Sequence, residues 1–202
     1  MKLYYLPGAC PLAAHIVLEW TGAPYELQQV SRTEIKEPAY LKMNPLGAVP
    51  VLQNDGITLT QNAAILEYLS ELHPGADLVG KTKEERAETR RWLGFCNSDL
   101  HRTFSLVFSA AAYVSDPKVQ EELVRNVMNR LHTLFGILND QLKGKTWLTG
   151  KRSIADPYLY TVMRWAKGKQ VDLAGMADLE AFFQHMSADT GVQAALKAEG
   201  LS

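Results

Sequence analysis

The feature that most constrains the fold is a change of periodicity part-way along the chain. Before about residue 73, short apolar runs alternate with amphipathic stretches, whereas from Thr82 onwards only helical patterns recur. At 202 residues, the chain is long enough for two small domains with ample cores. We therefore predict an α/β domain over residues 1–77 and an all-helical domain over residues 83–202. The linker between them holds Pro74, Gly75 and Gly80.

The first half predicts the order β-α-β-α-β-β-α. Its clearest signal is Asn54-Asp55-Gly56, which lies between two short apolar runs and is typical of a β-hairpin. In chain order, the patterns predict a strand (3–6), a helix (12–20), a strand (25–30), a loop with one helical turn (31–47), two hairpin strands (48–53 and 57–60) and a helix (62–73).

The second half predicts helices whose starts are marked by capping signals. Thr82 and Glu85 form a capping box that opens a long helix reaching Phe108. Asp116-Pro117 opens another, whose apolar stripe runs to Leu142. A second capping box, 153–156, opens a helix through Trp165, and shorter helical patterns cover 178–187 and 191–198.

Cys10 lies where the first strand and the Pro7-Gly8 turn give way to the first helix. Pro11 suits the first helical position, so Cys10 is expected at or beside the N-cap. The positive end of the helix dipole would there lower the pKa of the thiol. A dithiol enzyme would have its second cysteine at position 13, which is Ala13. A monothiol needs an outside thiol such as glutathione, although a buried structural cysteine fits the local pattern equally well.

Composition excludes several other classes of function. The formal net charge of −1 gives no basic surface for nucleic acid or an anionic membrane. Two cysteines do not form a disulfide framework, so a reducing cytoplasm is expected. There is no apolar stretch of roughly 20 residues, no secretory signal, no metal-ligand spacing and no glycine-rich phosphate loop.

Several segments, taken in order and spacing, resemble the cytosolic glutathione S-transferases, most of all the bacterial beta class. The resemblance covers nearly the whole chain. It rests on residues 1–10, 15–19, 44–52, 59–69, 92–93, 101–104, 153–159 and 198–201. It implies a thioredoxin-like first domain, with a mixed sheet, that binds glutathione. The helical second domain would cover a pocket for a hydrophobic co-substrate, giving the glutathione transferase fold.

The resemblance also assigns the ends of glutathione. Pro50 would follow a cis bond, leaving the backbone of Val49 to pair with the cysteinyl part. Gln61 and Asn62 would hold the γ-glutamyl end at a helix N-terminus. Lys36 would pair with the glycyl carboxylate, with Arg32 as a rival. Ala9 and Cys10 complete this part of the predicted glutathione site.

His101 matches a beta-class histidine that approaches the sulfur atoms of glutathione and Cys10. An imidazole there could hold or donate a proton near pH 7; the alternative is a surface histidine. Tyr5 is a further catalytic candidate, unless it only packs beneath Cys10.

The resemblance implies a homodimer in which Gly94, Asp99 and Arg102 lie near the partner's glutathione site. It also implies a co-substrate pocket, which we assign to Phe104, Phe108, Tyr113 and Trp165.

Two departures from the family pattern bear on activity. Pro11 replaces a hydroxyl residue, and Gln61 replaces an acidic residue that grips the γ-glutamyl ammonium, so weaker or altered glutathione binding is expected. Asp156 is interpreted as a structural cap and Cys96 as a packed residue.

The predicted function is conjugation of glutathione to hydrophobic electrophiles, with thiol–disulfide exchange or peroxidase activity through Cys10. The alternative is a non-catalytic ligand carrier, or a stress- or transcription-associated protein, on the same fold.

Overall fold

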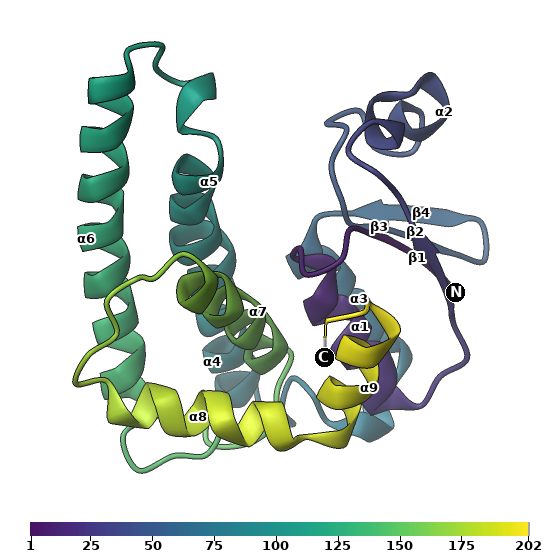
Figure 1. The fold of residues 1–202 in the computed structure, drawn as a ribbon. Helices are drawn as coiled ribbons and strands as arrows, with labels where there is room; N and C mark the ends of the chain where they lie inside the picture. Colours follow the sequence, from purple (N-terminus) through teal and green to yellow (C-terminus); the bar gives the residue numbers. More distant parts are fainter. Residues whose placement is uncertain (202) are drawn as a thin grey trace.

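The computed structural model of this chain describes residues 1–201; Ser202, the last residue of the predicted helical domain, lies outside them. The order of elements in the first half is the predicted one (Figure 1). It comprises β1 (Lys2–Tyr5), α1 (Pro11–Thr21), β2 (Glu26–Gln29), the 3₁₀ turn η1 (Glu34–Lys36), α2 (Pro38–Leu41), β3 (Val51–Asn54), β4 (Ile57–Thr60), α3 (Asn62–Leu72) and the 3₁₀ turn η2 (Pro74–Ala76).

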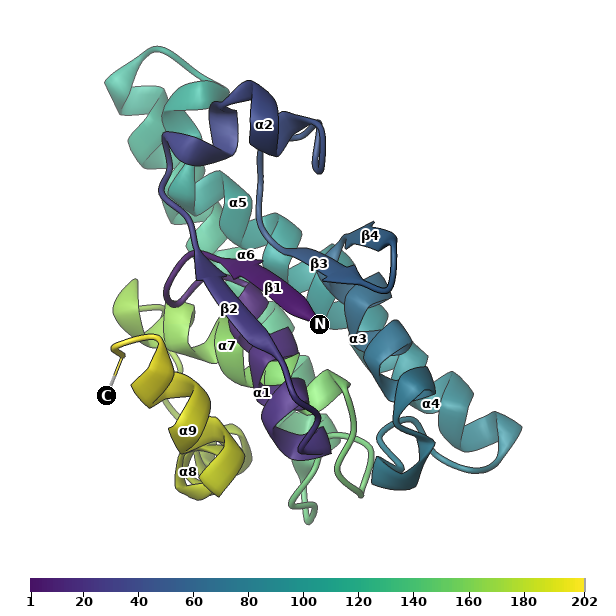
Figure 2. The same cartoon turned by 90° about the vertical axis from the view of Figure 1, so that its right-hand side faces the viewer.

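The four strands form one mixed sheet in the order β2-β1-β3-β4 (Figure 2). β1 runs parallel to β2 and antiparallel to β3, and β3 pairs antiparallel with β4. The predicted hairpin is confirmed: Asp55 and Gly56 separate β3 from β4, and both have positive φ angles, of 45° and 83°. A two-residue turn of this kind matches the twist of the strands that it connects.

α1 is the central helix of the molecule. It packs against β1 and α3 on one side and against α7 and α9 of the second half on the other. Every residue from Pro11 to Leu18 is buried, including His15. An amphipathic pattern is therefore weak in this helix, because it has no side that faces water. Its N-terminus, which carries Cys10, is held by both halves of the chain.

The second half, over residues 83–201, consists of helices joined by loops and contains no strand. It comprises α4 (Lys83–Gly94), the π-helical segment η3 (Phe95–His101), α5 (Arg102–Phe108), the 3₁₀ turn η4 (Ala110–Ala112), α6 (Pro117–Leu142), α7 (Ala155–Gly168), α8 (Ala177–Ala188) and α9 (Thr190–Ala198). No helix in residues 1–201 is both long enough and apolar enough to span a bilayer.

The capping box of α4 is present, whereas the one expected at 153–156 forms only in part, because the Ser153 hydroxyl accepts the N–H of Ala155 and not that of Asp156. Thr82 accepts the N–H of Glu85, whose carboxylate in turn accepts the N–H of Thr82. The carboxylate of Asp156, fully buried, accepts the N–H and hydroxyl of Ser153 at 2.7 and 2.9 Å and the N–H of Leu148 at 2.8 Å. Asp156 is therefore the structural cap that the sequence predicted.

The long helix expected from Thr82 to Phe108 is continuous, but its middle is π-helical. Residues on both sides of η3 keep right-handed helical angles, so the chain does not break there. A π-helical segment changes which side chains face inwards, and such segments are often found at functional sites. Here it carries Asn97 and His101, which both face the cavity described below.

Candidate active site

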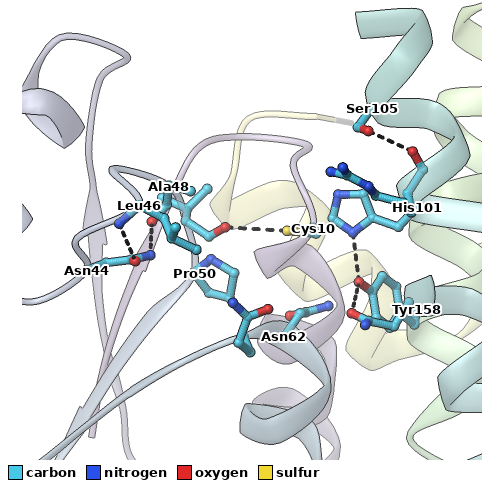
Figure 3. A pocket seen from close by; sticks show the side chains of 13 residues that line it. Cys10, Asn44, Leu46, Ala48, Pro50, Asn62, His101, Ser105 and Tyr158 are labelled. Atoms are coloured by element: carbon cyan, nitrogen blue, oxygen red, sulfur yellow. Dashed lines mark hydrogen bonds between the residues drawn. The ribbon is translucent and has the colours of Figure 1, made fainter. Parts of the chain in front are cut away.

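A cavity of about 380 Å³ lies where the N-termini of α1 and α3 face η3 and α7 (Figure 3). Seven of the predicted site residues line it: Cys10, Val49, Pro50, Gln61, Asn62, His101 and Arg102. The remaining lining residues are Asn44, Leu46, Ala48, Asn97, Ser105 and Tyr158. The structure thus brings together residues that are spread over almost 150 positions of the chain.

Cys10 is the N-cap of α1, as predicted, but its thiol is not activated in this structure. The sulfur makes no capping contact with the helix N–H groups. Instead it lies 3.6 Å from the carbonyl oxygen of Val49, which can accept the S–H but repels a thiolate. Only 7% of Cys10 is exposed, and burial raises the pKa of its thiol to about 12. The predicted lowering of this pKa is therefore wrong here, because desolvation outweighs the helix dipole.

The predicted cis bond between Val49 and Pro50 is present. The preceding loop is fixed by its own hydrogen bonds: the Ala48 carbonyl accepts the Tyr40 hydroxyl at 2.9 Å and the Asn44 amide at 2.6 Å. Because Asn44 is itself buried, this loop holds the Val49 backbone beside Cys10 in a defined position.

The start of α3 carries two features that point to a polar ligand. Gln61, its N-cap, has a φ of 71°, which is strained for a residue with a side chain and costs about 1 kcal/mol or more. Asn62 is 3% exposed, yet neither atom of its amide group has a hydrogen-bond partner among the described residues. An unpaired buried amide costs about 1–3 kcal/mol. A ligand that binds this amide would remove that cost.

His101 lies across the cavity from Cys10 (Figure 3). Its Nδ1 is 2.7 Å from the hydroxyl of Tyr158, which donates in turn to Oδ1 of Asn97 at 2.9 Å. Burial lowers the pKa of His101 to about 4. The expectation that His101 changes charge near pH 7 is therefore wrong for this structure, because its imidazole is removed from water and stays neutral.

Comparison with known proteins assigns the chain to a family. The family described as "Glutathione S-transferase, N-terminal domain" matches residues 1–71, and "Glutathione S-transferase, C-terminal domain" matches residues 104–189. The glutathione S-transferase GST-4.5 of Xanthomonas campestris pv. campestris is 47% identical over the full length of both chains. The chain belongs to the glutathione S-transferase family. Its first half is accordingly the thioredoxin-like domain of that fold, and its second half the helical domain.

Solved structures agree with this assignment. A glutathione S-transferase from Xylella fastidiosa superposes with a TM-score of 0.96 at 46% identity, covering 100% of this chain and 99% of the other. A sphingomonad glutathione S-transferase complexed with glutathione has a TM-score of 0.88 at 34% identity, with full coverage of both chains. A bacterial beta-class glutathione S-transferase from Sphingomonas chungbukensis has a TM-score of 0.88 at 33% identity, again with full coverage of both chains. The beta-class resemblance is therefore confirmed.

Lys36 of this transferase lies near the loop that borders the cavity. Its Nζ donates to the carbonyl oxygen of Gly47 at 2.7 Å. That places a cation beside Leu46 and Ala48, which both line the cavity. Neither Lys36 nor Arg32 is among the residues that line the cavity in the described chain, so which of them pairs with the glycyl carboxylate stays a prediction.

Three of the four residues predicted for the co-substrate pocket form one aromatic cluster. The ring of Trp165 lies 5.8 Å from that of Phe104 and 5.5 Å from that of Phe108, between centroids. Phe104 is fully buried, whereas Phe108 is 48% exposed and offers a face to a ligand. Trp165 also lies 4.9 Å from His101, which joins the cluster to the cavity. Tyr113 is half exposed and has no described ring contact with the cluster.

Tyr5 lies apart from the cavity. It is buried at the end of β1, packs against His15 with 6.3 Å between ring centroids, and does not line the cavity of the described chain. Burial also raises the pKa of its hydroxyl. These contacts favour the packing role for Tyr5 that the sequence analysis left open, against the side of the helix that carries Cys10. Ala9, Gly94 and Asp99 do not line the cavity either.

Sequence reasoning missed the polar residues behind His101. Asn97 precedes His101 by four positions, and two polar side chains at this spacing are neighbours on a helix, which is a signal that could have been noticed. Tyr158 stands in a segment already assigned to the family, but nothing local indicates that it contacts a residue 57 positions away. Within residues 1–201, no cluster of three or more His, Cys, Asp or Glu side chains could hold a metal ion.

Proposed function

We propose that this transferase binds reduced glutathione in the cavity at Cys10 and adds its sulfur to hydrophobic electrophiles. Three observations support this: the glutathione complex of the sphingomonad relative, the unpaired amide of Asn62, and the free N-terminus of α3. The N–H groups at a helix start bind carboxylates well, which suits the γ-glutamyl end of the peptide.

In the proposed complex, each part of glutathione meets a different element. Gln61 and Asn62 bind the γ-glutamyl group, the backbone of Val49 pairs with the cysteinyl group, and Lys36 pairs with the glycyl carboxylate. The sulfur then lies between Cys10 and His101, which face each other across the cavity. Ala9 supplies backbone next to the sulfur, and Arg102 adds a cation at the rim.

The raised pKa of Cys10 carries the mechanistic part of the proposal. A thiol with a pKa of about 12 is protonated at neutral pH, so it can donate an S–H hydrogen bond to the thiolate of glutathione. In conjugation, glutathione loses its thiol proton to the medium and its sulfur forms a bond to the electrophilic carbon. The leaving group, such as chloride, departs with the electron pair of its own bond. Cys10 remains chemically unchanged.

Thiol–disulfide exchange is the second proposed activity and is slower at neutral pH. Here the Cys10 thiolate attacks the glutathionyl sulfur of a disulfide between glutathione and a substrate thiol, forms a mixed disulfide with glutathione and releases the substrate thiolate. The thiolate of a free glutathione then attacks the mixed disulfide, which regenerates Cys10 and releases oxidised glutathione. Since only the thiolate attacks, the rate should increase steadily up to pH 9 and beyond. A peroxide could oxidise the same thiol, which would give peroxidase activity.

The Cys10→Ala variant separates the two activities. Wild-type protein incubated with oxidised glutathione at pH 9 should gain one glutathionyl group per chain by intact mass, removable by a reductant. Cys10→Ala should lose the adduct and the thiol-transfer activity but retain part of the conjugation of 1-chloro-2,4-dinitrobenzene. Cys96→Ala is the matched control and should behave as wild type, since Cys96 is fully buried. Failure of the wild type to bind or conjugate glutathione would leave only a carrier role.

The co-substrate and the assembly are part of the same proposal. Phe108 and Trp165 would contact a hydrophobic electrophile, with Phe104 beneath them.

A homodimer would cover Leu46, which is 68% exposed beside the cavity, and would bring the α4–η3 surface of the partner towards this cavity. Sedimentation at micromolar concentration should give a dimer, and Leu46→Asp should weaken it. A wild-type monomer with normal glutathione affinity would exclude this arrangement. Two free thiols and a need for reduced glutathione suit the cytoplasm.

A further inference from the structure

Both polar backbone groups of Gly8 are bound by residues of the second half of the chain. The N–H of Gly8 donates to Oε2 of Glu199 at 2.9 Å, and its carbonyl oxygen accepts the indole N–H of Trp165 at 2.8 Å. Gly8 has a φ of 70° and lies in the turn two residues before Cys10. In Figure 2, this loop between β1 and α1 lies close to α7 and to the C-terminal end of the chain.

The carboxylate of Glu199 is fixed on its other side as well. Oε1 lies 3.0 Å from Nδ1 of His15, and the side chains of both residues are fully buried. His15 stands on α1, little more than one turn after Cys10. A buried carboxylate is costly unless it is hydrogen-bonded, and Glu199 meets that requirement through Gly8 and His15. Glu199 therefore ties the turn before Cys10 to the helix after it.

Trp165 takes part in two contacts at once. Its N–H binds the Gly8 carbonyl, while its ring packs against His101 and Phe108. The family pattern assigned it only to the co-substrate pocket. Its hydrogen bond gives it a second role, because a residue that fixes the Gly8 carbonyl also limits how far the sulfur of Cys10 can move.

We propose that Trp165 and Glu199 are positioning residues for Cys10, acting through the two backbone groups of Gly8. This inference rests on the proposed reaction of Cys10 with glutathione. Held in this way, the sulfur keeps one place beside Val49 and in line with the sulfur of a bound disulfide. Released, the turn would expose the thiol more often to small reagents but present it to oxidised glutathione less precisely.

The test uses Trp165→Phe, which keeps an aromatic ring and removes only the N–H donor and one ring. Trp20→Phe is the matched control, because the indole N–H of Trp20 also joins two distant elements, donating to Asp189 at 2.7 Å, but does not touch Gly8. Two rates are measured at pH 9 by mass spectrometry localised to Cys10: glutathionylation by oxidised glutathione and alkylation by iodoacetamide.

For Trp165→Phe, glutathionylation should slow about fivefold and alkylation should accelerate about fivefold, the equivalent of one net hydrogen bond. Trp20→Phe should leave both rates within about twofold of wild type. Glu199→Ala should likewise slow glutathionylation and accelerate alkylation. Glu199→Gln keeps an acceptor for the N–H of Gly8, so both of its rates should return most of the way to the wild-type values. If Glu199→Ala does not fold, Trp165→Phe decides alone.

The inference would be overturned if glutathionylation and alkylation of Cys10 both slowed or both accelerated in Trp165→Phe. It would also be overturned if Trp20→Phe changed the two rates as much as Trp165→Phe does. Unchanged rates in Trp165→Phe would overturn it too. If the wild-type thiol is not glutathionylated at all, the proposed function of Cys10 fails, and alkylation still tests the positioning role because it needs no glutathione site.

Discussion

Protonation of His101 should destabilise the folded transferase. Its folded pKa of about 4 lies below the ordinary value of 6.5, because burial removes the imidazolium from water. The folded state therefore binds fewer protons than the unfolded chain between these two pH values. It follows that the contribution of His101 to stability is fully present above pH 6.5 and is lost as the pH falls towards 4.

The magnitude follows from the two pKa values. At pH 5 an imidazole of pKa 6.5 is almost fully protonated, whereas the folded His101 is still mostly neutral. Relative to pH 7.5, this difference lowers the free energy of unfolding by about 2 kcal/mol. His101 is only partly buried, so screening by water makes this change somewhat smaller without altering its sign.

Urea unfolding at pH 7.5 and pH 5 measures this directly in wild type and in His101→Gln. The wild type should lose about 2 kcal/mol more than the variant over this interval. The other histidines are the same in both proteins, so their effects cancel in the comparison. Equal losses in the two proteins, or an NMR titration of His101 with its midpoint near 6.5, would refute the reasoning. The pH profile of conjugation should show no inflection near pH 6.5 that is due to His101. The wild type and His101→Gln should therefore have profiles of the same shape around that pH.

Substitutions at three further positions test the surroundings of the site. Gln61→Glu should tighten glutathione binding by about 1 kcal/mol in calorimetry, less at high salt, by giving the γ-glutamyl ammonium a charged partner; unchanged affinity would mean that another group holds the ammonium. Tyr158→Phe should lower the free energy of unfolding by about 1–2 kcal/mol, since Nδ1 of His101 loses its partner. Asp156→Ala should lower it by about 3 kcal/mol, because it leaves three buried donors unpaired, and Asp156→Asn should lower it less.

The elements that the sequence predicted best are those decided by neighbouring residues. The hairpin depends on Asp55 and Gly56, which tolerate the positive φ angles that a two-residue turn requires. The capping box of α4 depends on Thr82 and Glu85, three positions apart. Such signals are complete within a few residues, so their structural outcome does not depend on the rest of the fold.

The π-helical segment could not be predicted in the same way. Its apolar residues, Cys96 and Leu100 among them, fit an ordinary helical pattern four residues apart. The change in winding depends on how η3 packs against α7 and α6, elements that begin some 20 to 60 residues later. The Tyr158 partner of His101 escaped notice for the same reason, since only the fold brings α7 to η3.

The two wrong pKa expectations have a common physical cause. A helix N-terminus at Cys10 and a histidine facing the cavity are both visible in the sequence, and each alone favours a charged group. Burial of both side chains comes from the meeting of the two halves, and its effect is larger. The cavity is therefore lined by a neutral thiol and a neutral imidazole, and Arg102 adds a cation to its lining. In such a cavity the charge at the reacting sulfur must come from glutathione itself, and the protein can stabilise it only through hydrogen bonds and the dipole of α1.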